Sequence, residues 1–186
     1  MSIYNTTNQY GIIAKTFHWG MALLIFGMIG IGLWMADLPD SLFKLQIYFW
    51  HISFGVLVLF LVCARLLWRW TNPRPLLPTT LKQWQIDAVH VGHTLLYFMM
   101  FLMPLSGWLM TSSAGFDVSF FKLFNLPTIL KPQKALFEIF STIHEIGAFA
   151  LIGLIAGHIG AALLHHFYFK DTILRRMLPW PDKKQS

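Results

Sequence analysis

Four long runs of apolar residues, separated by short polar stretches, dominate the sequence. They cover approximately residues 12–36, 45–70, 84–112 and 135–168. Each run exceeds the roughly 20 residues that an α-helix needs to cross the hydrocarbon core of a bilayer. In lipid a helix pairs every backbone polar group within its own segment, which an open strand cannot do. The pattern therefore predicts an all-α fold, an integral membrane four-helix bundle that forms a single domain over residues 1–186.

The connections between the runs differ in length and in residue type. Residues 37–40 form a tight polar turn, and residues 71–80, TNPRPLLPTT, contain three prolines that cannot continue a helix. Residues 113–134 are a longer loop. The first apolar run is too long for a cleaved signal peptide and no small-residue cleavage site follows it, so we expect it to remain as a membrane span.

Composition supports lipid as the solvent of the chain. Hydrophobic residues make up 56% of it and charged residues only 12%, about half of the charge that a soluble domain carries. One cysteine excludes an intramolecular disulfide, and the motif C-x-x-C-H, which attaches haem through thioethers, is missing from the sequence.

The positive charges are divided unevenly between the two ends of the predicted bundle. The formal net charge is +6, and ten of the 14 Lys and Arg residues fall at the end that carries both termini. The other end has Lys44, Lys122, Lys131 and Lys134. By the positive-inside rule, both termini are expected to be cytoplasmic. The basic residues sit at helix ends and not on one soluble face, so the charge gives no support for nucleic-acid binding.

Four histidines inside the apolar runs form two predicted layers. His144 and His158 are 14 residues apart, which is a rise of about 21 Å on a helix and returns the side chain to nearly the same face. By depth, His51 and His144 form an outer pair, and His18 and His158 form an inner pair. Haem b takes two imidazoles from facing helices in this way. Zinc is a weaker alternative because it needs four ligands in one cluster.

Two further features bear on a haem site, and each has a second explanation. Arg65 lies 14 residues after His51, so its guanidinium could pair with propionates of an inner haem or could extend to the lipid headgroups. Glycines at positions 20, 27, 55, 147, 153, 157 and 160 could make room for a flat macrocycle. They could equally allow close packing of the helices.

Several motifs together resemble those of one protein family. They are KTFHWG, FWHISFG, RLLWRWTNPRP, AVHVGHTLLY, PLSGWLM and IHEIGAFALIGLIAGHIGAALLHHFYFKD. The chain is identified from them as a member of the bacterial di-haem cytochrome b561 family, over roughly residues 10–180. The resemblance implies two haem b groups, with His18 and His158 as iron ligands of the inner one and His51 and His144 of the outer one.

The same resemblance implies a place and an activity. It indicates a multi-pass protein of the bacterial inner (cytoplasmic) membrane. Within the family the closest similarity is to superoxide oxidases, oxidoreductases that take electrons from superoxide at the periplasmic face and reduce ubiquinone. The alternatives are a cytochrome b subunit that relays electrons between quinone and a partner dehydrogenase or hydrogenase, and a haem-free channel or transporter with buried histidines. A protein partner is left open.

The remaining histidines and the outer lysines have weaker assignments. Asp87, His90 and His93 could line a quinone pocket, because imidazoles titrate in the range needed to supply protons, or could serve in helix packing. His165 and His166 could frame the same pocket or complement the dipole at the end of the last helix. Three lysines of the outer end have two possible roles. They could attract superoxide electrostatically or contact lipid headgroups, and they are Lys122, Lys131 and Lys134.

Overall fold

The computed structural model describes residues 2–179 and is mostly helical. Four long helices follow one another: α1 (Ile12–Ala36), α2 (Leu42–Thr71), α3 (Gln83–Ser113) and α4 (Lys134–Leu164). A π-helical turn, η1 (His165–Phe169), extends α4, and a short helix, α5 (Ile173–Met177), follows it. Two short strands, β1 (Ser119–Phe120) and β2 (Phe124–Asn125), lie between α3 and α4.

The four helices confirm the predicted apolar runs to within a few residues. The first begins and ends at the predicted residues, 12 and 36. The second begins three residues earlier than predicted, because the side chain of Ser41 accepts a hydrogen bond from the Lys44 amide (3.2 Å) and caps the helix. The third continues through Pro104 without interruption. All four are long and apolar enough to cross a membrane.

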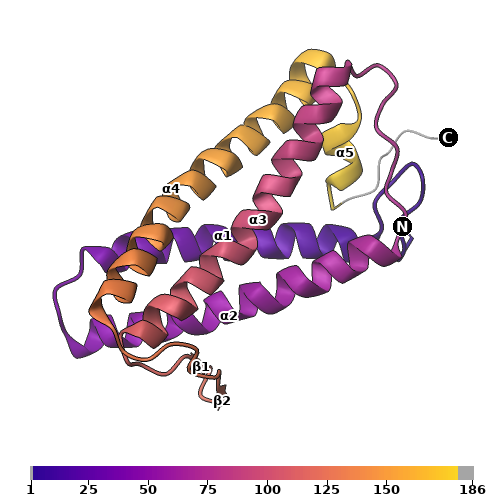
Figure 1. Ribbon diagram of the computed structural model, residues 1–186. Helices are drawn as coiled ribbons and strands as arrows, with labels where there is room; N and C mark the ends of the chain where they lie inside the picture. The colour runs from indigo at the N-terminus through magenta and orange to yellow at the C-terminus, as the bar shows by residue number, and fades with distance from the viewer. Residues whose placement is uncertain (1, 180–186) are drawn as a thin grey trace.

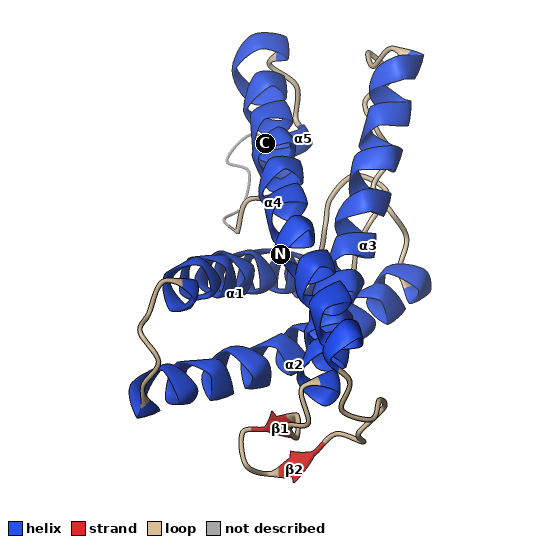
Figure 2. Cartoon of the chain, turned by 60° about the vertical axis from the view of Figure 1, so that its left-hand side comes forward, coloured by secondary structure: helices blue, strands red, loops and turns tan. Residues whose placement is uncertain are grey.

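The helices form two antiparallel pairs that are inclined to each other. The helix α1 packs against α2, α2 against α3, and α3 against α4, and both views show the α1–α2 pair crossing the direction of the α3–α4 pair (Figures 1 and 2). The two described ends of the chain meet, since the indole nitrogen of Trp19 donates to the Met177 carbonyl (2.8 Å). We name this the terminal end of the molecule, and the opposite end, where β1 and β2 lie, the hairpin end.

The β-hairpin was not predicted and departs from the all-α expectation. Its turn contains Phe121 (φ 50°) and Lys122 (φ 60°), whereas Asn-Gly is the usual sequence signal for left-handed turn residues. The hairpin is fixed to α2 by the fully buried Ser53. This hydroxyl donates to the Ser119 carbonyl (2.9 Å) and accepts from the Phe121 amide (3.2 Å). The hairpin therefore depends on contacts with another helix, and the local sequence alone does not predict it.

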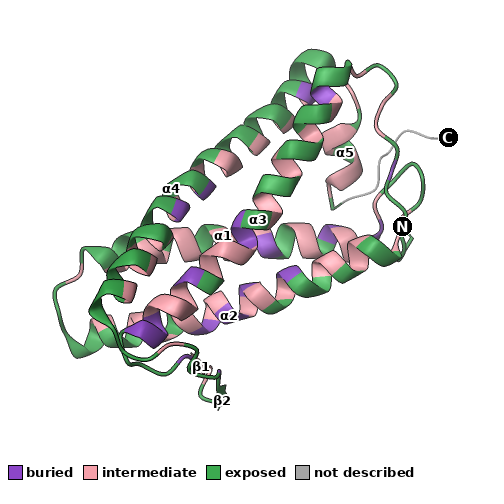
Figure 3. Cartoon of the chain, in the orientation of Figure 1, coloured by how far each residue is buried: buried purple, intermediate pink, exposed green. Residues whose placement is uncertain are grey.

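Little of the helix surface is buried in the protein. One small core joins Met21, Val62 and Met100, and a second joins Val56 to Val118 and Leu126 under the hairpin. Elsewhere the helices expose many large apolar side chains, and exposed positions, coloured green, occur along all four long helices (Figure 3). Such a surface would be a liability in water but suits a lipid environment.

Candidate cofactor site: two histidine pairs between the helices

The structure brings together the two predicted histidine pairs. The ring centres of His18 and His158 are 6.2 Å apart, and those of His51 and His144 are 6.4 Å apart. A metal ion held at about 2 Å from the nitrogen of each of two imidazoles places the ring centres about 6 Å apart. Both pairs therefore have the spacing of two ligands of one metal ion.

The pairs come from different helices and lie at different heights. The helix α4 contributes one histidine to each pair, while α1 contributes His18 and α2 contributes His51. Since α4 is continuous from Lys134 to Leu164, the 14 residues between its two histidines correspond to a rise of about 21 Å. The outer pair lies toward the hairpin end and the inner pair toward the terminal end.

Ser106 fixes the proton on His144 in the outer pair. Its buried hydroxyl donates its one proton to the Met103 carbonyl (2.9 Å), and it lies 3.0 Å from Nδ1 of His144. Because the hydroxyl proton is already used, the contact requires Nδ1–H of His144 to donate to the oxygen. The other nitrogen, Nε2, then keeps a free lone pair, which is the form of histidine that binds a metal.

Each ring of the outer pair lies against a glycine, and neither glycine is among those that the sequence suggested. A Cβ placed on Gly32 would lie 3.2 Å from Cε1 of His51, and one on Gly107 would lie 3.3 Å from Cε1 of His144. Of the expected positions, Gly147 packs tightly, since a Cβ there would lie 2.8 Å from the Met103 sulfur. Most of the others have nothing within 4 Å of such a Cβ: Gly20, Gly27, Gly153, Gly157 and Gly160. Close packing of the helices therefore accounts for Gly147. It does not account for the other five glycines, because no protein atom lies close to them.

The inner pair has charged and aromatic neighbours. Arg65 places Nη2 at 3.2 Å from Nδ1 of His18, so its guanidinium lies beside the inner pair. A third imidazole, His93, has its ring centre 5.5 Å from that of His158. His93 therefore faces the inner pair from α3.

The other two residues predicted to line a quinone pocket with His93 lie apart from it. Asp87 is exposed and accepts a hydrogen bond from the Gln83 amide (2.9 Å). His90 is also exposed, and its carbonyl accepts from the Thr94 hydroxyl. Of the three residues, His93 alone points toward the histidine pairs.

His165 has a partner that the sequence did not indicate. It is buried, and its Nδ1 lies 2.5 Å from Oδ2 of Asp171. The π-helical turn and the left-handed Lys170 (φ 53°) fold the chain back so that Asp171 reaches His165. The neighbouring His166 differs, since its Nδ1 is buried without a hydrogen-bond partner among the described residues. The two histidines are thus not an equivalent pair at the end of α4.

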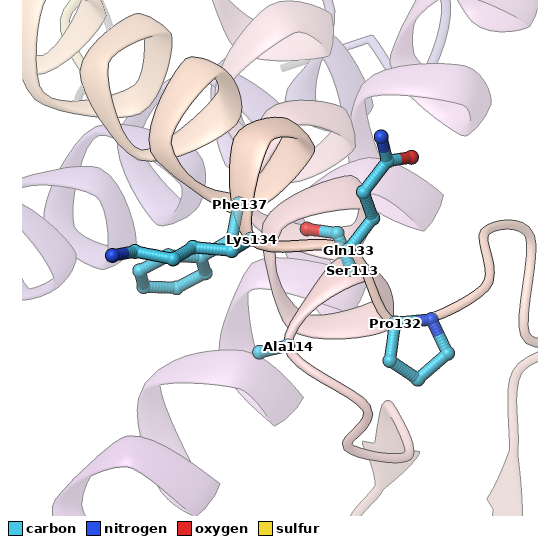
Figure 4. A pocket seen from close by; sticks show the side chains of 6 residues that line it. All are labelled: Ser113, Ala114, Pro132, Gln133, Lys134 and Phe137. Atoms are coloured by element: carbon cyan, nitrogen blue, oxygen red, sulfur yellow. The ribbon is translucent and has the colours of Figure 1, made fainter.

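The three predicted steering lysines are exposed at the hairpin end but do not form one cluster. Lys122 at the hairpin tip lies over the ring of Phe49 (5.6 Å), and Lys134 lies 3.7 Å from Glu138. Lys134 also lines a shallow hollow of about 390 Å³ between the end of α3 and the start of α4 (Figure 4). Its other walls are Ser113, Ala114, Pro132, Gln133 and Phe137. The side chain of Lys134 extends away from Gln133 and Pro132 in this view.

The arrangement of donors fits haem better than a clustered metal ion. Within residues 2–179 no group of three or more His, Cys, Asp or Glu side chains is arranged to hold a metal. Two-imidazole sites suit a macrocycle that supplies the other four ligands. At the outer pair, the lone pair left on Nε2 of His144 and the glycine seats are the features expected of axial haem ligands.

Comparisons with known proteins agree with this chemistry. The model of the family described as prokaryotic cytochrome b561 matches residues 9–180. Cytochrome b561 homolog 2 of Escherichia coli (strain K12) is 34% identical over 181 residues, which cover 96% of this chain and 95% of that protein. Cytochrome b561 homolog 1 of the same organism is 33% identical over 129 residues, or 69% of this chain and 73% of that protein.

A further relative is named for an activity. The probable superoxide oxidase CybB of Yersinia pestis is 29% identical over 129 residues, again 69% of this chain and 73% of that protein. The family model and the first relative cover nearly the whole chain, and the four apolar helices agree with them. The chain therefore belongs to the prokaryotic cytochrome b561 family, and is a multi-pass membrane electron-transfer protein of a family that binds haem b.

Proposed function

We propose that this protein oxidises superoxide at the periplasmic face of the bacterial inner membrane and reduces ubiquinone within that membrane. The observation that carries the proposal is the presence of two histidine pairs with the spacing of axial ligands, one toward each end of the helices. Two such sites at different depths suit electron transfer across a bilayer. The relative named as a probable superoxide oxidase supports the choice of substrate.

In this proposal the terminal end is cytoplasmic and the hairpin end is periplasmic. The support is the excess of Lys and Arg at the terminal end. It follows that His51 and His144 hold an outer haem, and His18 and His158 an inner haem, giving two haem b groups per chain. When bound, haem b supplies reversible one-electron oxidation and reduction.

The protein's own contribution is to position and isolate these groups. Because two histidines would hold each haem, superoxide would not need to bind iron and could give up its electron by outer-sphere transfer. Ser106 holds His144 in the proton form that leaves Nε2 free, and Gly32 and Gly107 fix the ring positions. Two superoxide ions each give up one electron and leave as oxygen, while one quinone takes up two electrons and two protons and becomes quinol.

The protons for quinone reduction would come from the terminal end. The buried pair of His165 and Asp171 is the best supported candidate there, since a carboxylate that accepts from Nδ1 orients the imidazole and leaves Nε2 for a substrate oxygen. His93, which lies beside His158, is the second candidate. His166, His90 and Asp87 are weaker candidates, because the structure gives them no contact with these groups.

At the hairpin end, exposed lysines would raise the encounter rate with an anion. Lys122, Lys131 and Lys134 are all exposed there. Lys134 is partly compensated by Glu138 at 3.7 Å, so Lys122 and Lys131 carry more of the proposed attraction. Because superoxide is an anion, this attraction should weaken as salt screens it.

The proposal is tested with the purified protein in two steps. A reduced-minus-oxidised spectrum with a pyridine haemochrome assay should give two b-type haems per chain. Stopped-flow mixing with superoxide should then reduce these haems, and added ubiquinone should reoxidise them and yield quinol. Heat-treated protein with the same haem content controls for reaction of superoxide with loose haem.

Each alternative has its own outcome in this test. A protein without haem would be a channel or transporter of another kind. A protein with two haems that reacts slowly with superoxide but exchanges electrons with quinone would be a relay subunit for a partner dehydrogenase. Either result would overturn the proposed activity.

A further inference from the structure

Two arginines on α2 share one aromatic partner near the inner histidines. Arg65 and Arg69 are four residues apart and lie on the same side of the helix, with their guanidinium carbons 5.6 and 5.2 Å from the ring centre of Tyr97. Like charges at this spacing repel each other. Arg65 otherwise contacts two neutral atoms, Nδ1 of His18 and the Met21 sulfur. The arrangement is one that an anion would stabilise.

The described part of the chain does not supply that anion. In residues 2–179 the ion pairs join Lys44 to Asp40, Lys134 to Glu138 and His165 to Asp171, and none includes Arg65 or Arg69. The two described carboxylates at the terminal end are already engaged, Asp87 with Gln83 and Asp171 with His165. The five other described carboxylates lie in the half of the molecule toward the hairpin end: Asp37, Asp40, Asp117, Glu138 and Glu145.

The segment before α1 brings a phenol to the same place. Tyr10 is half-buried and directly precedes Gly11, the N-cap of α1. Burial raises the pKa of the Tyr10 hydroxyl, and the nearby arginines only partly oppose this. The phenol therefore keeps its proton at physiological pH and is available as a hydrogen-bond donor.

Residues 2–11, which we name the N-terminal strap, are fixed over the end of α2. Asn5 donates to the Pro73 carbonyl (3.0 Å), and Tyr4 stacks on Trp68 with ring centres 5.7 Å apart. Gly11 allows the crossing, since a Cβ there would lie 2.5 Å from the Tyr4 carbonyl carbon. The strap thus carries Tyr10 across the end of α2 that bears Arg69.

We propose that Arg65, Arg69 and Tyr10 form a carboxylate-binding site for the propionates of the inner haem, with the N-terminal strap as its cover. The inference rests on the proposed haem at His18 and His158. Haem b carries two propionates, and two guanidiniums with one phenol offer charge-assisted hydrogen bonds of the kind that bind carboxylates. The contact of Arg65 with His18 joins this site to the inner pair. A lipid phosphate has the same anionic chemistry but no such link to a histidine.

The test measures haem content and midpoint potentials of purified variants. We expect Arg69→Gln to lower the midpoint potential of one of the two haems and leave the other unchanged, because removing a cation disfavours the added electron. Arg65→Gln/Arg69→Gln should lose one of the two haems. Tyr10→Phe should give a smaller potential shift, and Arg69→Lys should fall between wild type and Arg69→Gln.

The matched control is Arg74→Gln, which removes an exposed cation from the same end of the molecule. Two haems with wild-type potentials in Arg65→Gln/Arg69→Gln would overturn the inference while leaving the proposed function intact. So would loss of bound phospholipid, measured as phosphorus per chain, without any change of potential. A wild-type protein without haem would instead overturn the proposed function itself.

Discussion

The outer and inner histidine pairs have nearly the same ring separation but different surroundings. At the outer pair the neighbours are neutral: the Ser106 hydroxyl on His144 and two glycines against the rings. At the inner pair Arg65 contacts His18, and the His93 ring lies beside His158. The outer site is shaped by close backbone approach, and the inner site by charge and aromatic side chains.

If the proposed function holds, this difference would give electron transfer a direction. A cation near a redox group stabilises the form that has gained an electron, and the effect is stronger where the dielectric constant is low. The inner site has two arginines without a carboxylate partner among residues 2–179. The contacts described above for the outer pair, with Ser106, Gly32 and Gly107, are all neutral. Electrons that enter from superoxide at the outer site would therefore move toward the inner site.

The largest effect should come from removing one ligand of each pair. We expect His144→Ala and His158→Ala each to keep one of the two haems and to lose electron transfer from superoxide to quinone. The haem that remains in His144→Ala should have a higher midpoint potential than the one that remains in His158→Ala, because it lies near the arginines. Pyridine haemochrome assays and redox titrations measure both quantities.

The control for these variants is His90→Ala, which changes an exposed histidine on α3 and should leave both haems in place. Retention of two haems by both His144→Ala and His158→Ala would refute the ligand assignment. Equal potentials in the two variants would contradict the electrostatic difference between the sites.

A smaller effect is expected from the hydrogen bond that orients His144. Ser106→Ala should lower the affinity for the outer haem about 10- to 100-fold, as is usual when a residue that orients a metal ligand is changed. Haem transfer to apomyoglobin gives the rate of loss. Ser113→Ala is the matched control. The buried Ser113 hydroxyl also donates a hydrogen bond to a carbonyl of α3, that of Met110, but it has no hydrogen bond to a histidine among the described residues. Equal loss from the two variants would show that Ser106 acts only in helix packing.

A still smaller effect is expected at the exposed lysines. Replacing Lys122, Lys131 and Lys134 with Gln should slow superoxide oxidation by less than about 10-fold and flatten its dependence on salt, since steering acts on the encounter rate. Stopped-flow rates at several ionic strengths measure this. Replacing Lys82, which is exposed at the other end, should leave the salt dependence unchanged. The same rate and salt slope in the triple variant would remove steering from the mechanism.

The smallest effects are expected from glycine substitutions. One kind of glycine has open space beside it, and the other lies against a histidine ring. Gly30→Ala should stabilise α1 by up to about 1 kcal/mol through helix propensity, because this exposed glycine has nothing within 4 Å of the new methyl group. Gly107→Ala gains the same propensity but puts its methyl 3.3 Å from the His144 ring. We therefore expect Gly107→Ala alone to change the spectrum of the outer haem. Thermal unfolding and low-temperature absorption spectra distinguish the two variants.

The sequence predicted the helices and the histidine pairs because both depend on regular spacing. Apolar runs long enough to span a bilayer have few alternatives to a helix. On a helix, a separation of 14 residues brings His144 and His158 to one face whatever surrounds them. The same 14-residue spacing placed Arg65 on the side of α2 that carries His51, and the structure shows it in contact with His18. The sequence had left open whether its guanidinium extends inward or to the headgroups.

The hairpin and the choice of glycines could not be predicted in this way. The left-handed residues Phe121 and Lys122 carry no turn signal, and their conformation depends on contacts with Ser53 on another helix. Gly32 and Gly107 differ from the other glycines only in which side chain lies opposite them. Contacts between distant segments have no periodic signature.

By itself, the sequence determined that this is a helical membrane protein of the prokaryotic cytochrome b561 family with histidines at two depths. The helical spans and the two depths follow from helix geometry and the apolar bilayer interior, and the family follows from the match over residues 9–180. Only the tertiary structure decided that the outer pair has neutral neighbours and the inner pair has Arg65, Arg69 and the N-terminal strap beside it. The reason is that charge and close approach act through space, between residues whose separation in the chain follows no rule.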